Sequence, residues 1–277
     1  MSRYDKMFAG LRERGEGAFV PFVTLGDPDI ETSERILRTL LDAGADALEL
    51  GLPFSDPVAD GSTIQAANIR ALAAGAGLTT GLNTVRRVRA DYPDVPLGLL
   101  VYANLVESYG LDAFYGGVAA AGADSVLVAD VPLREGGRFQ AAAQRHGVAP
   151  IFIAPPDASE ERLRGVAQES RGYVYLLARA GVTGVGGGTA KPAERVIRTL
   201  RDAGAPPTLL GFGIAQPEHV RAALDAGADG AISGSAVVRI IEQHGGDEAA
   251  MLAGLRAFVQ EMKAATRTEP EHGTKGS

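Results

Sequence analysis

The sequence predicts an α/β protein whose strands close into a (β/α)8 barrel, the TIM-barrel architecture, with additional helices. Eight short apolar runs alternate with helical patterns along the chain, and four helices end on the same glycine motif. The chain has 277 residues, which fits eight units and a typical barrel length of about 250 residues. An open, doubly wound parallel sheet is the competing architecture.

The eight apolar runs have the length and composition of strands that are covered on both faces, as in a parallel sheet. They read AFVPFVTL, DALELGL, PLGLLVY, DSVLVAD, APIFIAP, GYVYLLA, PTLLGFG and DGAISG.

The segments between the strands have the three- and four-residue apolar spacing of helices, as in ETSERILRTLLDAG. Glycines suited to a left-handed helix end precede the next strand at four of the junctions, namely Gly44, Gly122, Gly204 and Gly227. Further helical patterns precede the first strand, separate the second from the third, and close the chain. We therefore expect one barrel domain over 1–265, followed by a disordered polar tail over 266–277.

Composition excludes several classes of function. The 27 Lys and Arg against 34 Asp and Glu give a net charge of −7, so a nucleic-acid partner is not expected. The absence of cysteine excludes disulfides and thiolate chemistry. No apolar stretch has the length of a signal peptide or of a membrane span, so we expect a cytoplasmic protein without a membrane partner. The four histidines show no metal-ligand spacing, and no lysine ends a strand as a Schiff-base aldolase would need. We therefore expect carboxylates to be the catalytic groups.

Glu49 is the candidate catalytic acid. Alternation along the second strand turns Leu48 and Leu50 toward the helices, so Ala47, Glu49 and Gly51 should face the barrel axis. Catalytic residues lie at the carboxyl ends of barrel strands, and burial should raise the pKa of Glu49. A rim carboxylate paired with a cation is the alternative.

Other strand ends supply candidate walls for a ligand cavity. By the same alternation Tyr175 faces the axis, and Phe22, Leu100 and Tyr102 stand at the ends of the first and third strands, although each is also an ordinary core residue. Asp56 and Asp60 follow the second strand in FSDPVADG, where Asp-Pro and Asp-Gly are common turn pairs.

The two last strands predict a phosphate site. GFGIAQPEHV and SGSAVVRII are glycine-rich turns that open helices, and barrels commonly hold a phosphate in these two loops. The candidate residues are Gly211, Gly213, Gly234 and Ser235; plain tight turns are the alternative. ARAGVTGVGGGTAKP, at 178–192, resembles a lid in which Gly181, Thr183 and Gly184 could touch a ligand, or else a flexible linker.

The chain resembles the family of tryptophan synthase alpha subunits over nearly its whole length, to about residue 265. LELGLPFSDPVADGSTIQAANIRAL carries the resemblance, supported by GLLVYANLV, DSVLVADVPL, APIFIAPP, YLLARAGVTG, GFGI and GAISGSAVV. Such proteins cleave indole-3-glycerol phosphate to indole and glyceraldehyde 3-phosphate without a cofactor of their own.

The resemblance also implies roles for individual residues. Glu49 would be the acid/base catalyst and Asp60 would bind the indole N–H, while Ile64 and Phe212 would lie near the ligand. Gly184, Gly213, Gly234 and Ser235 would hold the phosphate. Pro53, Asp56 and Pro57 would face a beta subunit that carries pyridoxal phosphate, in an alpha2beta2 heterotetramer that passes indole through a tunnel.

The sequence departs from the family pattern in three places. Ser62 and Ala66 replace a usual proline and asparagine, and Gly186, Gly187 and Gly188 make the lid unusually rich in glycine. These changes bear on lid closure and on coupling to a beta subunit. The alternative functions are a stand-alone lyase that releases free indole, a phosphoribosyl-type isomerase, and a non-catalytic barrel that binds a phosphorylated ligand.

Overall fold

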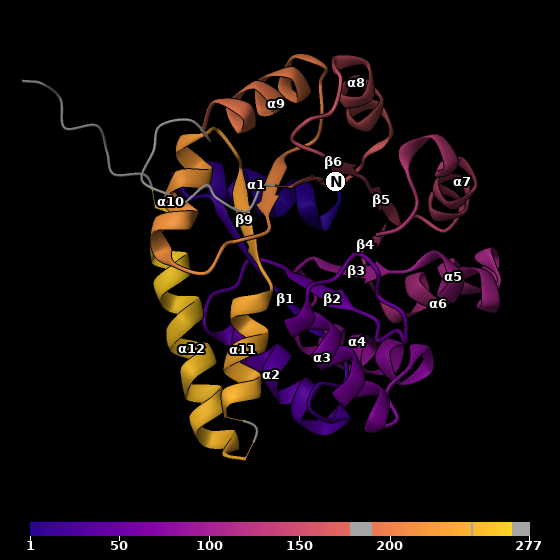
Figure 1. The fold of residues 1–277 in the computed structure, drawn as a ribbon, viewed down its shortest axis with the longest axis vertical. Helices are drawn as coiled ribbons and strands as arrows, with labels where there is room; N and C mark the ends of the chain where they lie inside the picture. Colours follow the sequence, from indigo (N-terminus) through magenta and orange to yellow (C-terminus); the bar gives the residue numbers. More distant parts are fainter. Residues whose placement is uncertain (178–189, 245, 268–277) are drawn as a thin grey trace, which may run out of the picture.

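The protein is a barrel of parallel strands surrounded by helices (Figure 1). The computed structural model describes residues 1–177, 190–244 and 246–267. The strands are β1 Ala18–Thr24, β2 Leu48–Gly51, β3 Leu97–Val101, β4 Ser125–Val128, β5 Ala149–Ile151, β6 Ile153–Ala154, β7 Val174–Leu177, β8 Thr208–Gly211 and β9 Gly230–Ser233.

The sheet closes on itself. Its strand order is β5-β4-β3-β2-β1-β9-β8-β7-β6, and its neighbouring strands pair in parallel. The two ends of this order, β5 and β6, are consecutive in the chain and are separated only by Phe152. The predicted barrel is confirmed, with one difference: the run expected as a single fifth strand is interrupted at Phe152.

Helices cover the outer face of the sheet and one end of the barrel. They are α1 Arg3–Glu13, α2 Ile30–Asp42, α3 Ser62–Ala73, α4 Leu78–Asp91, α5 Ala103–Tyr109, α6 Leu111–Ala121, the 3-10 turn η1 Leu133–Glu135, α7 Gly137–Arg145, α8 Glu160–Glu169, α9 Ala190–Asp202, α10 Pro217–Asp225, α11 Ser235–Gln243 and α12 Glu248–Ala264. The additional helices α1, α4 and α12 lie where the sequence predicts them. The four predicted helix-ending glycines all have positive φ, between 72° and 106°.

Side chains from the strands divide into two apolar layers. Leu48, Leu50 and other outward residues pack with the helices in one large cluster. Ala47, Phe22 and Tyr175 belong to a second cluster that fills the barrel interior. This division follows from strand alternation, since successive side chains point to opposite faces of a sheet.

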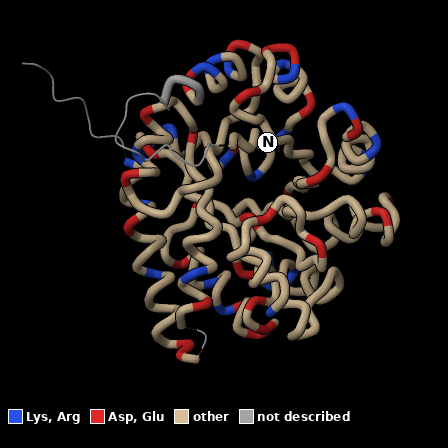
Figure 2. The backbone as a smooth tube through the Cα atoms, viewed as in Figure 1, with Lys and Arg blue, Asp and Glu red and all other residues tan. Residues whose placement is uncertain are grey.

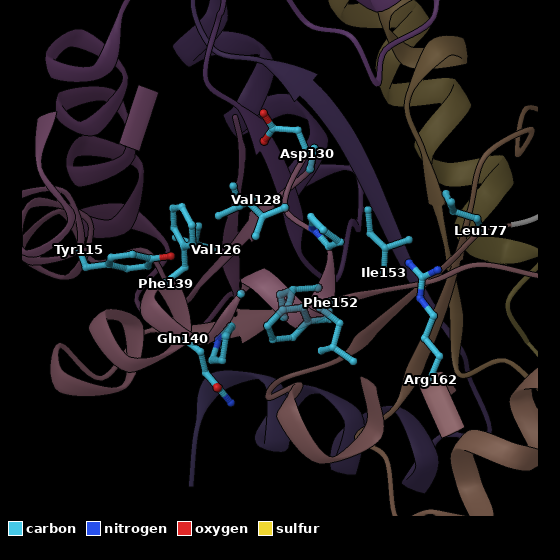
Figure 3. Close-up of a pocket in the computed structure, with 17 residues that line it drawn as sticks. Tyr115, Val126, Val128, Asp130, Phe139, Gln140, Phe152, Ile153, Arg162 and Leu177 are labelled. Atoms are coloured by element: carbon cyan, nitrogen blue, oxygen red, sulfur yellow. The ribbon is translucent and has the colours of Figure 1, made fainter. Parts of the chain in front are cut away.

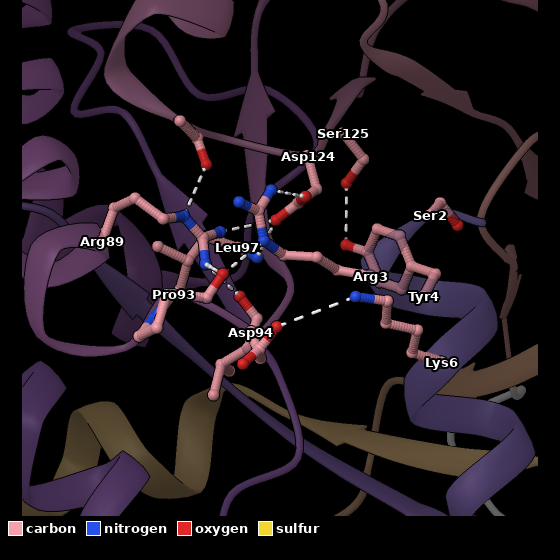
Figure 4. A network of polar contacts seen from close by, with 12 residues as sticks. Ser2, Arg3, Tyr4, Lys6, Arg89, Pro93, Asp94, Leu97, Asp124 and Ser125 are labelled. Atoms are coloured by element: carbon pink, nitrogen blue, oxygen red, sulfur yellow. Dashed lines mark hydrogen bonds and ion pairs between the residues drawn. The ribbon is translucent and has the colours of Figure 1, made fainter.

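Helix α1 closes the barrel at the end where the strands begin. Its residues Tyr4, Phe8 and Leu11 join the interior cluster, and the Tyr4 hydroxyl lies 2.8 Å from Ser125 Oγ at the start of β4. Asp124 holds the helix from outside by accepting from Arg3 at 2.9 Å, while it also pairs with Arg89 of α4 at 2.6 Å (Figure 4).

The packed structure extends two residues beyond the expected boundary at 265. Thr266 is fully buried, and its carbonyl accepts a hydrogen bond from the Gly17 N–H at 2.9 Å. Arg267 forms an isolated antiparallel β-bridge with Glu16. The expectation of a disordered tail is therefore wrong for Thr266 and Arg267. Residues 268–277 lie outside the described part of the chain.

Charged residues of both signs are interspersed along the outer elements (Figure 2). No helix in the described part of the chain has both the length and the apolar character that crossing a membrane requires. Within the same ranges, no three His, Asp or Glu side chains gather closely enough to hold a metal ion.

The Asp124 cluster leads to a stability prediction. Replacing Asp124 with Ala leaves the partly buried Arg89 guanidinium without its carboxylate, and this should lower the free energy of unfolding by about 2 kcal/mol or more. Asp94→Ala is the matched control, because Asp94 is 83% exposed and meets Lys6 only at 3.9 Å; it should cost less than about 1 kcal/mol. Urea unfolding of both variants measures the difference, and equal costs would contradict this account.

Candidate active site

Glu49 lies inside the barrel near its carboxyl-terminal end. It is the second residue of β2 and is only 2% exposed. Gly51, two residues further on, accommodates the ring of Phe22, since a Cβ there would lie 2.7 Å from that ring. The inward orientation expected from the sequence is confirmed, and no cation of the described residues forms an ion pair with Glu49.

Within the described part of the chain, the carboxyl group of Glu49 has one direct partner. Tyr173, just before β7 on the other side of the barrel, donates its hydroxyl to Glu49 Oε1 at 2.9 Å. Burial raises the pKa of Glu49, the Tyr173 hydrogen bond partly opposes the rise, and the nearby charge of Asp60 adds a smaller increase, with a net value of about 7. A carboxyl with a pKa near 7 can both give and take a proton at neutral pH.

Asp60 is held at the mouth by a tyrosine. The Tyr102 side chain is buried at the end of β3, and its hydroxyl accepts from the Ala59 N–H at 3.2 Å. Burial raises the pKa of Asp60, and a hydrogen bond from Tyr102 works in the opposite direction. Tyr102 therefore links the β2–α3 loop to β3, and the electrostatic effect of Asp60 on Glu49 connects the two carboxylates.

Two polar contacts fix the ends of this loop. Asn68 of α3 accepts from the Phe54 N–H at 2.8 Å, and the Phe54 ring stacks on Tyr102 with 5.2 Å between ring centroids. Arg70 of α3 donates to both carboxylate oxygens of the buried Asp27, at 2.7 and 2.9 Å. Helix α3 is thereby anchored to the β1–α2 loop, and Asp60 precedes it by two residues.

The predicted phosphate turns lie side by side. The Ser233 hydroxyl at the end of β9 donates to the Ile214 carbonyl in the loop after β8, at 2.6 Å. Gly234 caps α11 and lies against Phe22, and Ser235 is the first residue of that helix. The start of α11 has no side-chain cap, so its N–H groups are available to an anion.

Phe212 and Gly213 have unusual backbone conformations, with φ of 77° and 80°. A positive φ is uncommon for an aromatic residue, and such strain concentrates at functional sites. The Phe212 side chain is 54% exposed. A Cβ at Gly213 would meet no described residue within 4 Å.

Gly211 has a different neighbour. A Cβ there would fall 2.2 Å from the Tyr175 hydroxyl, so the glycine accommodates the Tyr175 ring. This packing explains the residue without reference to a phosphate.

The remaining wall candidates converge on the interior. Phe22 and Tyr175 belong to the interior cluster, and Ile64 and Leu100 pack against it. These four come from β1, β3, β7 and α3, and Tyr102 directly follows β3. Thr183 and Gly184 lie outside the described residues, as do Gly181 and Gly186–Gly188.

The loop expected to meet a partner exposes only part of its surface. Pro53 and Pro57 are buried, whereas Asp56 is exposed. Val58 is 81% exposed and was not singled out from the sequence, although an apolar residue in an acidic loop is a visible signal. Sequence reasoning also missed Tyr173 as the partner of Glu49, because no local pattern records a contact across the barrel.

Comparisons with known proteins identify related chains. The profile of the family described as "Tryptophan synthase alpha chain" matches residues 8–267. The tryptophan synthase alpha chain of Shigella dysenteriae serotype 1 is 57% identical over 268 residues, which cover 97% of this chain and all of the relative. The alpha chain of Escherichia coli O127:H6 is 57% identical over 267 residues, with 96% of this chain and all of the relative covered.

A solved structure has the same fold. Tryptophan synthase subunit alpha from Legionella pneumophila str. Paris superimposes with a TM-score of 0.87 at 32% identity, covering 96% of this chain and 98% of that one.

The buried Glu49 should make stability depend on pH. Its pKa is about 7 when folded and 4.5 in the ordinary state, so between these values the folded protein keeps a proton that the unfolded chain releases, and stability falls as the pH rises. Glu49→Gln removes this loss. The free energy of unfolding of Glu49→Gln minus that of wild type should therefore be about 2 to 3 kcal/mol larger at pH 8 than at pH 5.

Denaturant unfolding at the two pH values checks this. Glu135→Gln is the control, because Glu135 is exposed on η1 and should show no such difference. A pH-independent effect of Glu49→Gln would refute the raised pKa.

Proposed function

The chain belongs to the tryptophan synthase alpha chain family, whose reaction is the cleavage of indole-3-glycerol phosphate to indole and glyceraldehyde 3-phosphate, and we propose that Glu49 and Asp60 are its catalytic residues. The supporting observation is the buried Glu49 carboxyl, with a pKa of about 7, in the same interior as the loop that carries Asp60. A group with this pKa suits proton transfer in both directions.

The reaction is a retro-aldol cleavage, and it needs two proton transfers. Indole is a poor leaving group until its C3 atom is protonated. Glu49 in its protonated form gives that proton to C3, and the resulting carboxylate takes a proton from the chain hydroxyl next to the bond that breaks. The C–C electron pair returns to the indole ring and the hydroxyl carbon becomes the aldehyde of glyceraldehyde 3-phosphate, so the acid is regenerated.

Asp60 has an electrostatic role in this proposal. Protonation of C3 places positive charge on the ring N–H, and a carboxylate beside that nitrogen stabilises it in a site that excludes water. Tyr102 supports this position by holding both Ala59 and Asp60. Proton transfer of this kind contributes roughly 10²- to 10⁴-fold to a rate.

The substrate phosphate is assigned to the opposite side of the mouth. Gly213, Gly234 and Ser235 offer backbone N–H groups and a hydroxyl at the start of α11, and Gly184 is assigned to the same group by family resemblance. Gly211 is a weaker candidate, because its space is occupied by Tyr175. Phe22, Ile64, Leu100, Tyr102, Tyr175, Phe212 and Thr183 are proposed as contacts for the remainder of the substrate.

Membership of this family implies a beta subunit as partner. We infer an alpha2beta2 assembly in which the partner carries pyridoxal phosphate and receives indole through a tunnel, while this chain uses no cofactor of its own. The exposed Asp56 and Val58 are the surface features of the β2–α3 loop that favour contact there. The buried Pro53 and Pro57 would shape the loop from within.

Replacing Glu49 with Gln should abolish cleavage and keep binding. The amide preserves the size of the side chain and the partner of Tyr173, but it cannot transfer the proton. Indole release, followed spectrophotometrically, should fall by at least about 10²-fold, and calorimetry should find affinity for intact indole-3-glycerol phosphate within a few-fold of wild type. Glu135→Gln should retain full activity, and normal turnover by Glu49→Gln would remove Glu49 from this role.

A beta chain should stimulate the isolated protein. Adding a tryptophan synthase beta chain is expected to raise the rate of indole-3-glycerol phosphate cleavage, and Val58→Asp should increase the concentration needed for half of that effect by roughly tenfold or more. Arg12→Gln, at the opposite end of the barrel and with the same change of −1 in net charge, should leave the titration unchanged. A high rate without stimulation would instead favour a stand-alone lyase.

A further inference from the structure

A second cavity lies outside the barrel wall, between β4 and β5 on one side and η1 and α7 on the other. It has a volume of about 320 Å³ (Figure 3). Glu49 and Asp60 do not line it, so it is separate from the candidate active site.

The walls of this cavity are largely apolar. Val126 and Val128 of β4 form one side, while Phe139 of α7 and Phe152, at the break between β5 and β6, face it. An apolar cavity of about 150 Å³ accepts benzene, so this volume is sufficient for a flat bicyclic molecule.

One hydroxyl inside the cavity has no protein partner. Tyr115 of α6 is 2% exposed, and its side chain makes no hydrogen bond with any described residue. In Figure 3 its oxygen points toward Val126 and Phe139. Burial raises the pKa of Tyr115, so the hydroxyl stays neutral and can donate or accept a hydrogen bond. The hydroxyl oxygen is not sealed within the core but opens into the cavity, where a polar ligand atom can bond to it.

A cation lies at the edge of the same cavity. Arg162 of α8 is exposed, and its guanidinium forms no ion pair with the described residues. It points toward Ile153 and Leu177 in Figure 3. Asp130, the acidic residue of the lining, instead accepts from the Ala103 N–H at 2.8 Å. A guanidinium free of carboxylates can lie over an electron-rich ring, and among protein rings the indole of Trp is the best partner for this contact.

We propose that this cavity is a second binding site for indole. The ring would lie among Val126, Val128 and Phe152, its N–H would bond to the Tyr115 hydroxyl, and Arg162 would cover it. The cavity adjoins the barrel interior, because Ala129, Ile153 and Leu177 line it and also pack against the interior cluster. The choice of indole as the ligand rests on the proposed function. The cavity and its lining residues are independent of that function.

Methyl-resolved NMR of the full chain can test this site directly. With labelled Val and Leu methyl groups, a titration with indole should shift the signals of Val126, Val128 and Leu133 by the ring current of the bound ligand. Leu100 and Leu209 report separately on the barrel interior. Binding seen only at Leu100 and Leu209, up to the solubility limit of indole, would overturn the proposal.

Tyr115→Phe tests the polar contact. Loss of the hydrogen bond should weaken the response of the cavity methyls by roughly 2- to 10-fold, with no change at the barrel interior. The thermal midpoint should not fall, because the hydroxyl has no partner in the free protein. Tyr109→Phe removes a hydroxyl from the neighbouring α5 outside the cavity, and it should alter neither response.

An unchanged affinity in Tyr115→Phe, or a lowered midpoint, would show that the hydroxyl has no role in binding indole. These readouts are independent of turnover. Failure of Glu49 to act as the catalyst would therefore leave this test intact, and an empty cavity would leave the lyase assignment intact.

Discussion

The carboxyl of Glu49 is buried inside a closed barrel, where its charged form loses the hydration that water supplies, and the neighbouring residues only partly compensate. Tyr173 provides one hydrogen bond, and the nearby Asp60 adds like charge. The result is a group balanced between its two protonation states at neutral pH. Barrel closure is essential to this balance, since an open sheet would admit water and return the carboxyl to its ordinary acidity.

The same constraint explains how the mouth is built. Asp60 must lie near Glu49 without being neutralised by a cation, and the chain achieves this with neutral donors and with anchors placed further away. Tyr102 contacts the loop itself, whereas the Arg70–Asp27 pair holds the helix that follows. Among the residues that the structure describes, the anchoring cation Arg70 thus pairs with Asp27 and not with either carboxylate that would do the chemistry.

Much of this could be read from the sequence, because it depends on short-range periodicity. Alternation in ALELG is sufficient to direct Glu49 inward, and the repeated glycines mark where helices end. Contacts between distant segments leave no such pattern: Tyr173 reaches Glu49 across 124 positions, and Tyr4 meets Ser125 across 121. The break at Phe152 was also hidden, since APIFIAP has the composition of one continuous strand. The cavity beside it follows from how helices pack against that break.

The position of α1 has a consequence for the order in which the protein can assemble. Its residue Tyr4 leaves the ribosome near the start of synthesis, yet it packs on Tyr173, which is made only after more than half of the 277-residue chain. The first segment to emerge must therefore wait undocked while most of the strands form. The contact between α1 and the barrel interior forms late, so a nascent chain cannot acquire the buried environment of Glu49 until β7 has been synthesised.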